Sequence, residues 1–204
     1  MAEGVFITFE GIDGVGKSTQ AVHLCSVLES LGHLTLHTRE PGGTRIGAEI
    51  RRILLDPSLQ ELQPQTEILL YAADRAQHAA QVIQPALADG RIVVCERFID
   101  SSLAYQGFGL GWDRAAIARI NSWAVNGLAP RLTIYLDQEP QHALKRAGQD
   151  RIEQRTLAYY QRVRSGFLQM AREDSARYVV VDAGGTIAEV SQRILDTVQR
   201  RLTQ

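Results

Sequence analysis

Residues 11–18 carry the clearest chemical pattern in the sequence. They read Gly-Ile-Asp-Gly-Val-Gly-Lys-Ser, which matches the phosphate-binding loop G-x-x-x-x-G-K-[ST]. Glycines allow a tight loop whose N–H groups face an anion, and a helix beginning there adds partial positive charge. Lys17 is placed to reach the β- and γ-phosphates of a nucleoside triphosphate, and Ser18 to ligate Mg²⁺. We therefore expect a site for a nucleoside triphosphate and its metal ion.

The choice of a lysine in this loop supports the same interpretation. The chain has 22 Lys and Arg residues, of which only Lys17 and Lys145 are lysines. A chain that otherwise uses arginine has a lysine where a flexible point charge is needed instead of a planar fork.

The elements around the loop suit this chemistry. Residues 5–9 are apolar and β-branched, which predicts a buried strand, and apolar residues then recur at helical spacing from Ala21 to Leu28. Further strands are predicted by apolar runs at residues 34–38, 92–96, 132–137 and 178–182, with helical patterns between them. The alternation predicts an α/β fold of three layers, a five-stranded parallel sheet with helices on both faces.

Charged residues end or follow most of the predicted strands. In a parallel α/β sheet, ligands bind beyond the carboxyl ends of the strands. We expect one rim to collect Asp13, Arg39, Glu40, Glu96, Arg97, Asp137 and Asp182. Glu96 is suited to hold Mg²⁺, directly or through water, and Arg97 to bind a phosphate bidentately.

Two other groups of residues are less specific by themselves. Tyr71 and Arg75 lie one helical turn apart and could stack on and hydrogen-bond a base, although core packing with a surface charge is the commoner meaning of such a pair. Lys145, Arg146 and Arg151 surround Gly148 in a short basic loop that could close over a nucleotide, although such loops are more often solvated turns.

Local patterns give several structural expectations. Asp100, Ser101 and Ser102 predict a helix cap, and residues 107–111, with three glycines, predict a mobile connection. We expect Trp112 and Trp123 to be packing residues. Cys25 and Cys95 lie in apolar contexts, which predicts buried free thiols instead of a disulfide framework.

Length and charge limit the class of protein. We expect 204 residues to form one domain, residues 1–204. A formal net charge of −1 gives no reason to expect a nucleic acid partner. No apolar run is long enough for a membrane span or a signal peptide, so we expect no membrane partner and a cytoplasmic location.

Four stretches together resemble the bacterial thymidylate kinases, P-loop nucleoside monophosphate kinases that phosphorylate dTMP to dTDP. They are residues 9–18, 38–44 (Thr-Arg-Glu-Pro-Gly-Gly-Thr), 96–107 (Glu-Arg-Phe-Ile-Asp-Ser-Ser-Leu-Ala-Tyr-Gln-Gly) and 150–153 (Asp-Arg-Ile-Glu). They occur in the family's order and span most of the chain. The second and third stretches are far more specific than the phosphate-binding loop alone.

The resemblance implies a role for each matching residue. The residues implied to bind ATP are Gly11, Ile12, Asp13, Gly14, Val15, Gly16, Lys17, Ser18 and Thr19, with Mg²⁺ on Ser18 and Glu96. Those implied to bind dTMP are Asp13 (the sugar 3′-hydroxyl), Arg51, Tyr71 (stacking on thymine), Arg75 (bonding O4), Arg97 (the phosphate), Ser102, Tyr105 (excluding a 2′-hydroxyl) and Gln106. Glu40 is implied to lie near the reaction centre. A homodimer is implied in the same way.

The resemblance also bears on the catalytic arginine. Some family members carry it inside the phosphate-binding loop, and others supply it from a lid. Gly14 occupies that loop position here, so the chain resembles the lid-arginine type, with a lid at about residues 145–153. Arg146 and Arg151 are both candidates. Lys17, Arg97, Asp13 and Glu40 complete the expected catalytic set.

Two alternatives remain on the sequence. Another nucleoside monophosphate kinase or a deoxynucleoside kinase would differ in what fills the acceptor pocket, and Arg97 in the latter would face no phosphate. A GTPase-type switch or an ATP-binding regulatory module is the other class. The Asn-Lys-x-Asp motif of guanine-specific switches is absent, because Lys145 follows Leu144.

Overall fold

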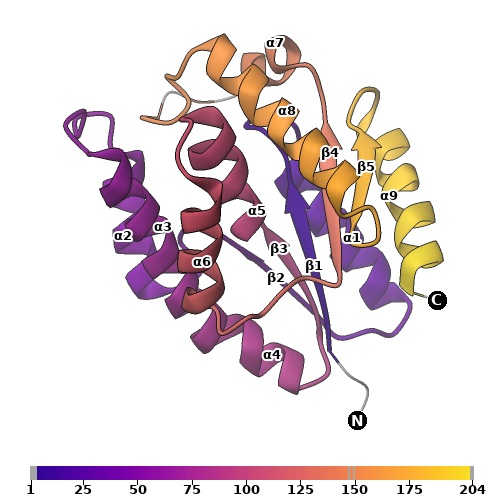
Figure 1. The fold of residues 1–204 in the computed structure, drawn as a ribbon. Helices are drawn as coiled ribbons and strands as arrows, with labels where there is room; N and C mark the ends of the chain where they lie inside the picture. The colour runs from indigo at the N-terminus through magenta and orange to yellow at the C-terminus, as the bar shows by residue number, and fades with distance from the viewer. Residues whose placement is uncertain (1–3, 147, 149, 203–204) are drawn as a thin grey trace.

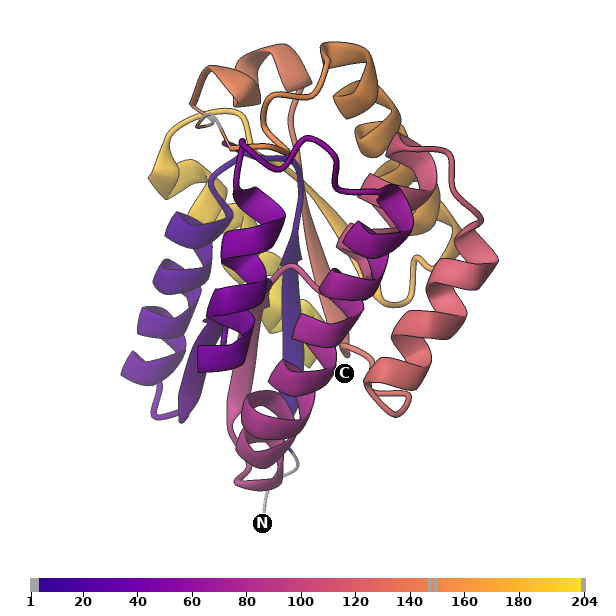
Figure 2. The ribbon, with the colours of Figure 1, turned by 90° about the vertical axis from the view of Figure 1, so that its left-hand side faces the viewer.

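β1 (Val5–Glu10) is the central strand of a five-stranded sheet in the computed structural model, which describes residues 4–146, 148 and 150–202. The strand order is β2 (Thr35–Arg39), β3 (Ile92–Glu96), β1, β4 (Leu132–Asp137) and β5 (Tyr178–Asp182), and every pair of neighbours is parallel. β2 and β3 lie on one side of β1 within the sheet, and β4 and β5 lie on the other. Helices cover both faces of the sheet (Figures 1 and 2). The predicted three-layer α/β fold is confirmed.

The register aligns the carboxyl ends of the strands. Glu96 at the end of β3 pairs with Phe9 of β1 and with Arg39 of β2, and Asp137 pairs with Asp182. The residues that follow β1, β2 and β3 therefore emerge at one edge, as the sequence predicts. Asp137 and Asp182 share that edge, but Asp137 is bound there by Arg164.

Helices connect these strands. The α-helices are α1 (Lys17–Ser30), α2 (Arg45–Leu55), α3 (Pro64–His78), α4 (Gln84–Ala88), α5 (Ile99–Ser102), α6 (Arg114–Ala124), α7 (Pro140–Ala143), α8 (Leu157–Glu173) and α9 (Ile187–Leu202). Two π-helical segments, η1 (Ala79–Ile83) and η2 (Leu103–Gly109), continue α3 and α5, and the 3-10 segment η3 (Leu144–Arg146) follows α7. The helical path from α3 thus runs through η1 into α4.

Both faces of the sheet are packed. On one face Phe6 and Val93 form a cluster with Ala79, Ile83 and Ala86 of η1 and α4. The other main cluster joins strand residues to α1, α8 and α9, and within it Phe167 stacks on Tyr135 with ring centroids 4.8 Å apart. Because both faces of the inner strands are covered, β1, β3 and β4 are nearly continuous apolar runs, whereas the edge strand β2 (Thr-Leu-His-Thr-Arg) is not.

Several local expectations are corrected. Ser101 and Ser102 lie inside α5 instead of capping it, and Phe98 precedes its first residue. Residues 107–109, expected in a mobile connection, belong to η2. Trp123 is 82% exposed, so the expectation that it packs in the interior is wrong.

Other expectations hold. Cys25 and Cys95 are free and buried. Among the described residues, none of the helices combines the length and apolar character that crossing a bilayer requires.

Candidate active site

Glycines shape the loop between β1 and α1. Gly11, Gly14 and Gly16 all have positive φ, at 143°, 76° and 99°. A Cβ atom on Gly11 would lie 2.8 Å from the carbonyl oxygen of Leu136, so the strand end leaves no room for a side chain there. The loop therefore has the conformation that an anion-binding nest needs, at the amino terminus of a 14-residue helix.

Lys17 folds back over this loop. Its Nζ donates to the carbonyl oxygens of Gly11, at 3.1 Å, and Ile12, at 2.8 Å. Burial, and then the positive charge of Arg97, lower the pKa of Lys17 to about 7. An anion bound beside this ammonium group would raise its pKa and keep it protonated.

Ser18 and Glu96 meet at the same end of the sheet. The Ser18 hydroxyl donates to Oε2 of Glu96, and His37 Nε2 lies 2.9 Å from Oε1. Burial acts to raise the pKa of Glu96, but hydrogen bonds from His37 and Ser18 outweigh it and the pKa is lowered. A hydroxyl and an ionised carboxylate are oxygen donors of the kind that Mg²⁺ prefers, so this pair fits the ion.

Arg97 joins the loop to the neighbouring pocket. Its backbone is left-handed, with φ at 64°, and its guanidinium donates to Asp13 at 2.5 Å and to the carbonyl oxygen of Gly11 at 3.1 Å. The Tyr105 hydroxyl lies 3.0 Å from both Arg97 Nη2 and Asp13 Oδ2. Burial acts to raise the pKa of Asp13, but the charges of Arg97 and Lys17 outweigh it and the pKa is lowered. Asp13 is therefore an ionised carboxylate that orients Arg97.

One pocket beside Arg97 contains all the residues implied to bind dTMP. Its lining residues are Asp13, Glu40, Pro41, Arg51, Leu55, Tyr71, Arg75, Arg97, Ser101, Ser102, Tyr105, Gln106, Asp150 and Ile152. We call it the acceptor pocket. Sequence reasoning missed Pro41, Leu55, Ser101, Asp150 and Ile152 as lining residues.

A buried polar network forms the floor of the acceptor pocket. Arg75 donates to Glu40 at 2.7 Å, to Ser102 at 3.1 Å, to the carbonyl oxygen of Phe98 at 3.0 Å and to Asn121. Arg75 is 1% exposed, so its position is fixed by these partners.

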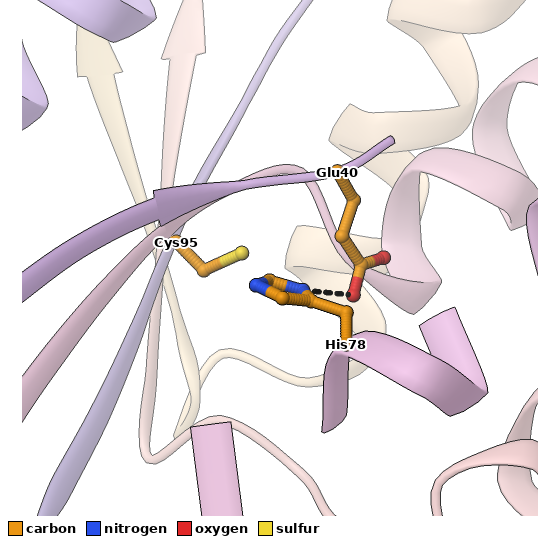
Figure 3. Close-up of side chains that lie close together, drawn as sticks. All are labelled: Glu40, His78 and Cys95. Carbon is orange, nitrogen blue, oxygen red and sulfur yellow. Dashed lines mark hydrogen bonds and ion pairs between the residues drawn. The ribbon is translucent and has the colours of Figure 1, made fainter. Parts of the chain in front are cut away.

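Glu40 has a second partner in His78. The His78 Nδ1 atom lies 3.0 Å from the other carboxylate oxygen, and Cys95 lies beside the imidazole ring (Figure 3). Ligand atoms of Glu40, His78 and Cys95 lie within 4.8 Å of one another. Since Arg75 and His78 already take both carboxylate oxygens, and Arg75 brings a positive charge, we assign no metal ion here.

A second, larger pocket surrounds the phosphate-binding loop. It is lined by Asp13, Gly14, Val15, Gly16, Lys17, Ser18, Thr19, Gln20, Arg39, Glu40, Arg51, Glu96, Arg97, Arg146, Ala183, Gly185, Thr186, Ile187 and Val190. We call it the donor pocket. Gly11 and Ile12 do not line it; the carbonyl oxygens of both accept hydrogen bonds from Lys17. The wall from Ala183 to Val190 was not predicted, although Gly184-Gly185 after β5 lies at the expected edge.

The two pockets meet, because Asp13, Glu40, Arg51 and Arg97 line both. Arg97 and Arg51 therefore bring positive charge to the boundary between the two pockets.

Arg146 and Arg151, the two candidates for the catalytic arginine, lie in different environments. Arg146 is exposed and lines the donor pocket. Arg151 is bonded to the carbonyl oxygen of Leu54 at 2.9 Å and to Glu67 at 2.7 Å.

Comparisons with known proteins agree with this geometry. The family model for thymidylate kinase matches residues 9–194. A thymidylate kinase of Trichlorobacter lovleyi is 48% identical over 97% of this chain and 98% of its own, and one of Pelotomaculum thermopropionicum is 50% identical over 89% and 86%. The crystal structure of thymidylate kinase from Ehrlichia chaffeensis matches with a TM-score of 0.81 and 32% identity, covering 97% of this chain and all of that one. The match spans both pockets and nearly the whole sequence, and the chain belongs to the thymidylate kinase family.

Proposed function

We propose that this chain transfers the γ-phosphoryl group of ATP directly to the phosphate of dTMP, giving dTDP for dTTP synthesis. The observation that carries the proposal is the boundary between the two pockets, where Asp13, Arg51 and Arg97 line both. A triphosphate on the phosphate-binding loop and a monophosphate in the acceptor pocket would meet there.

The donor pocket supports the binding of ATP. The amides of residues 13–19 and the Lys17 ammonium are assigned to the phosphates. Ser18 and Glu96 are the residues that would hold Mg²⁺, which when bound neutralises charge on the β- and γ-phosphates. Ala183, Thr186 and Ile187 line the same pocket and are assigned to the nucleoside end.

The acceptor pocket supports the binding of dTMP. We assign Arg97 and Arg51 to its phosphate, Asp13 to the sugar 3′-hydroxyl and Tyr105 to exclusion of a 2′-hydroxyl. Tyr71 is assigned to stacking on thymine, with polar contacts from Ser102, Gln106 and Arg75. Arg75 uses four of its five N–H groups on Glu40, Ser102, Asn121 and Phe98, which leaves one Nη2 hydrogen for the thymine O4.

We assign the catalytic lid arginine to Arg146, in a single domain with a lid at about residues 145–153, of which 147 and 149 lie outside the described residues. Its exposed side chain lines the donor pocket, whereas the contacts of Arg151 hold the base of the lid to α2 and α3. Glu40 acts through Arg75 and His78 as a positioning residue near the reaction centre.

The reaction needs no strong general base. A phosphate monoester has its second pKa near ~6, so the acceptor is already largely dianionic at pH 7. Catalysis then consists of alignment and charge neutralisation. Lys17, Arg97 and Arg146 supply the positive charge around two phosphate groups that would otherwise repel.

We also propose a homodimer formed through α2, α3 and α6, in the cytoplasm, where the two free thiols stay reduced. α3 packs against both α2 and α6. Large apolar side chains are exposed on all three helices, namely Ile46 (47%), Leu69 (57%) and Trp123 (82%). We expect Trp123→Glu to convert a dimer into a monomer in sedimentation velocity. Leu34→Glu, at a site that is 67% exposed and lies away from these helices, is the control that stays dimeric.

A coupled assay of ATP consumption tests the proposed reaction. The acceptors are dTMP, dUMP, AMP, CMP, GMP and thymidine, each varied at saturating ATP and Mg²⁺. We expect kcat/KM to be highest for dTMP and no turnover with thymidine. Faster turnover of thymidine would indicate a nucleoside kinase, and ATP binding without turnover of any acceptor would indicate a binding module.

A further inference from the structure

Glu67 on α3 joins the lid to the acceptor pocket. Its carboxylate is 1% exposed and lies one helical turn before Tyr71. Oε1 accepts from Nε2 of Gln106 in η2 at 2.9 Å. Oε2 accepts from Nη2 of Arg151 and from Nη2 of Arg155, both at 2.7 Å. Two segments distant in the sequence, η2 and residues 151–155, therefore meet on one side chain of α3.

This arrangement determines which end of the Gln106 amide faces a ligand. An ionised carboxylate can only accept hydrogen bonds, so Gln106 must turn its NH₂ group toward Glu67. The amide is planar, and its carbonyl oxygen is then directed away from Glu67. Within the described residues, the structure records one hydrogen bond of the Gln106 side chain, the bond to Glu67, and Gln106 lines the acceptor pocket. The carbonyl oxygen, which is the one acceptor of this amide, is thereby left for a ligand in the pocket.

The other polar group on the pocket floor has the opposite character. Arg75 has only donors, and one of its N–H groups remains after its four protein partners. A base that fits a donor beside an acceptor must offer a carbonyl oxygen beside a ring N–H. The O4 and N3–H of thymine or uracil do so. Cytosine offers an amino group and an unprotonated N3 at the same edge, so both contacts would be repulsive.

We propose that Glu67 is a specificity-determining positioning residue, which selects N3–H pyrimidines over cytosine by fixing the orientation of the Gln106 amide. The inference rests on the proposed function, because it takes the acceptor pocket to be the base site. It concerns the choice between thymine and cytosine and makes no distinction between thymine and uracil.

Glu67→Gln gives a sharp test. Arg151 and Arg155 still require an acceptor, so the carbonyl oxygen of the new amide takes the place of Oε2 and its NH₂ group faces Gln106. Gln106 must then rotate its carbonyl oxygen toward residue 67 and its NH₂ group toward the base. A donor in the pocket disfavours N3–H and favours the bare N3 of cytosine.

The readout is the ratio of kcat/KM for dTMP to kcat/KM for dCMP, because a merely structural loss lowers both terms together. We expect the unaltered enzyme to favour dTMP by at least ~100-fold, and Glu67→Gln to lower that ratio at least ~10-fold. Arg155→Gln is the matched control, since it removes one partner of Glu67 but leaves the bond to Gln106. Its ratio should stay within ~2-fold of the unaltered enzyme, whatever its total activity.

A second variant keeps the test decisive if Glu67→Gln fails to fold. Gln106→Leu removes the amide, so the ratio should fall as well, and adding Glu67→Gln to it should change the ratio no further. A retained ratio in folded Glu67→Gln or in Gln106→Leu would overturn the inference. An unaltered enzyme without preference for dTMP would overturn the proposed function instead.

Discussion

The protonation of Lys17 gives a quantitative prediction about ATP binding. In the free protein, burial and the nearby Arg97 lower the pKa of Lys17 to about 7, while Asp13, Glu96 and Glu10 act in the opposite direction. Bound phosphates would restore a pKa near the ordinary value of ~10.4. Binding of ATP above pH 7 should therefore take up a proton from solution.

The magnitude follows from this pKa. At pH 8 about one tenth of the free protein carries the proton on Lys17, so binding should take up ~0.9 proton. From pH 8 to pH 9 the Kd for ATP should rise about tenfold, equivalent to ~1.4 kcal/mol. This window lies above the titration of ATP, whose last phosphate pKa is near ~6, and above Glu10, whose pKa burial raises to about 7.

Calorimetry in two buffers with different ionisation enthalpies measures the uptake directly. Lys17→Arg is the control, because arginine stays protonated throughout and its uptake should be close to zero. An uptake below ~0.2 proton at pH 8, together with a Kd that does not change between pH 8 and pH 9, would refute the reasoning. The same pKa has a consequence for stability. Between pH 7 and ~10.4 the unfolded chain binds the proton and the folded chain does not, so this lysine's contribution to the free energy of unfolding should grow as pH rises.

Three further predictions concern single side chains. Arg97→Ala should lower kcat/KM for dTMP at least ~100-fold, about 2.7 kcal/mol, because Arg97 lines both pockets; steady-state kinetics with near-normal rates would count against its role. Tyr105→Ala should relax discrimination against the ribose form of the acceptor, and competition between the deoxyribose and ribose monophosphates measures it; unchanged discrimination would contradict the assignment. Phe167→Ala should lower the free energy of unfolding by ~3–5 kcal/mol in urea titrations, since the ring is fully buried and stacked on Tyr135; a loss under ~1 kcal/mol would show that the site relaxes around the cavity.

Much of the fold follows from local patterns in the sequence. The strands at 92–96, 132–137 and 178–182 have the predicted bounds. For β3 and β4 the reason is that strands covered on both faces are nearly continuous apolar runs. The rule that ligands bind at the carboxyl edge then brings Asp13, Glu40 and Arg97 together.

The glycines of residues 107–111 favour a mobile connection in the sequence, and this expectation is wrong for residues 107–109. Residues 107–109 were expected to be mobile, yet they form η2. A Cβ on Gly109 would lie 2.5 Å from the Tyr159 ring, and one on Gly107 would lie 2.8 Å from Arg114. These glycines allow close packing, and a sequence pattern does not distinguish that use from flexibility.

The other functional residues that the sequence does not predict are defined by contacts between residues that are distant in the sequence. Glu67 looks like any acidic residue in the first turn of a helix, and its partners are 39, 84 and 88 residues away. The same contacts separate Arg151 from Arg146, which the sequence alone left equivalent. The donor-pocket wall at Ala183 and Thr186 has no charged residue to mark it, and only its position after β5 gave a signal.

The most direct test of the central claim is the fate of the phosphoryl group. With ATP labelled in its γ-phosphoryl group, Mg²⁺ and dTMP, we predict that the label appears in the terminal phosphate of dTDP in the first turnover, with none bound to the protein. Label released as inorganic phosphate at the same rate with and without dTMP, or carried on the chain before it reaches dTDP, would contradict direct transfer between the two pockets.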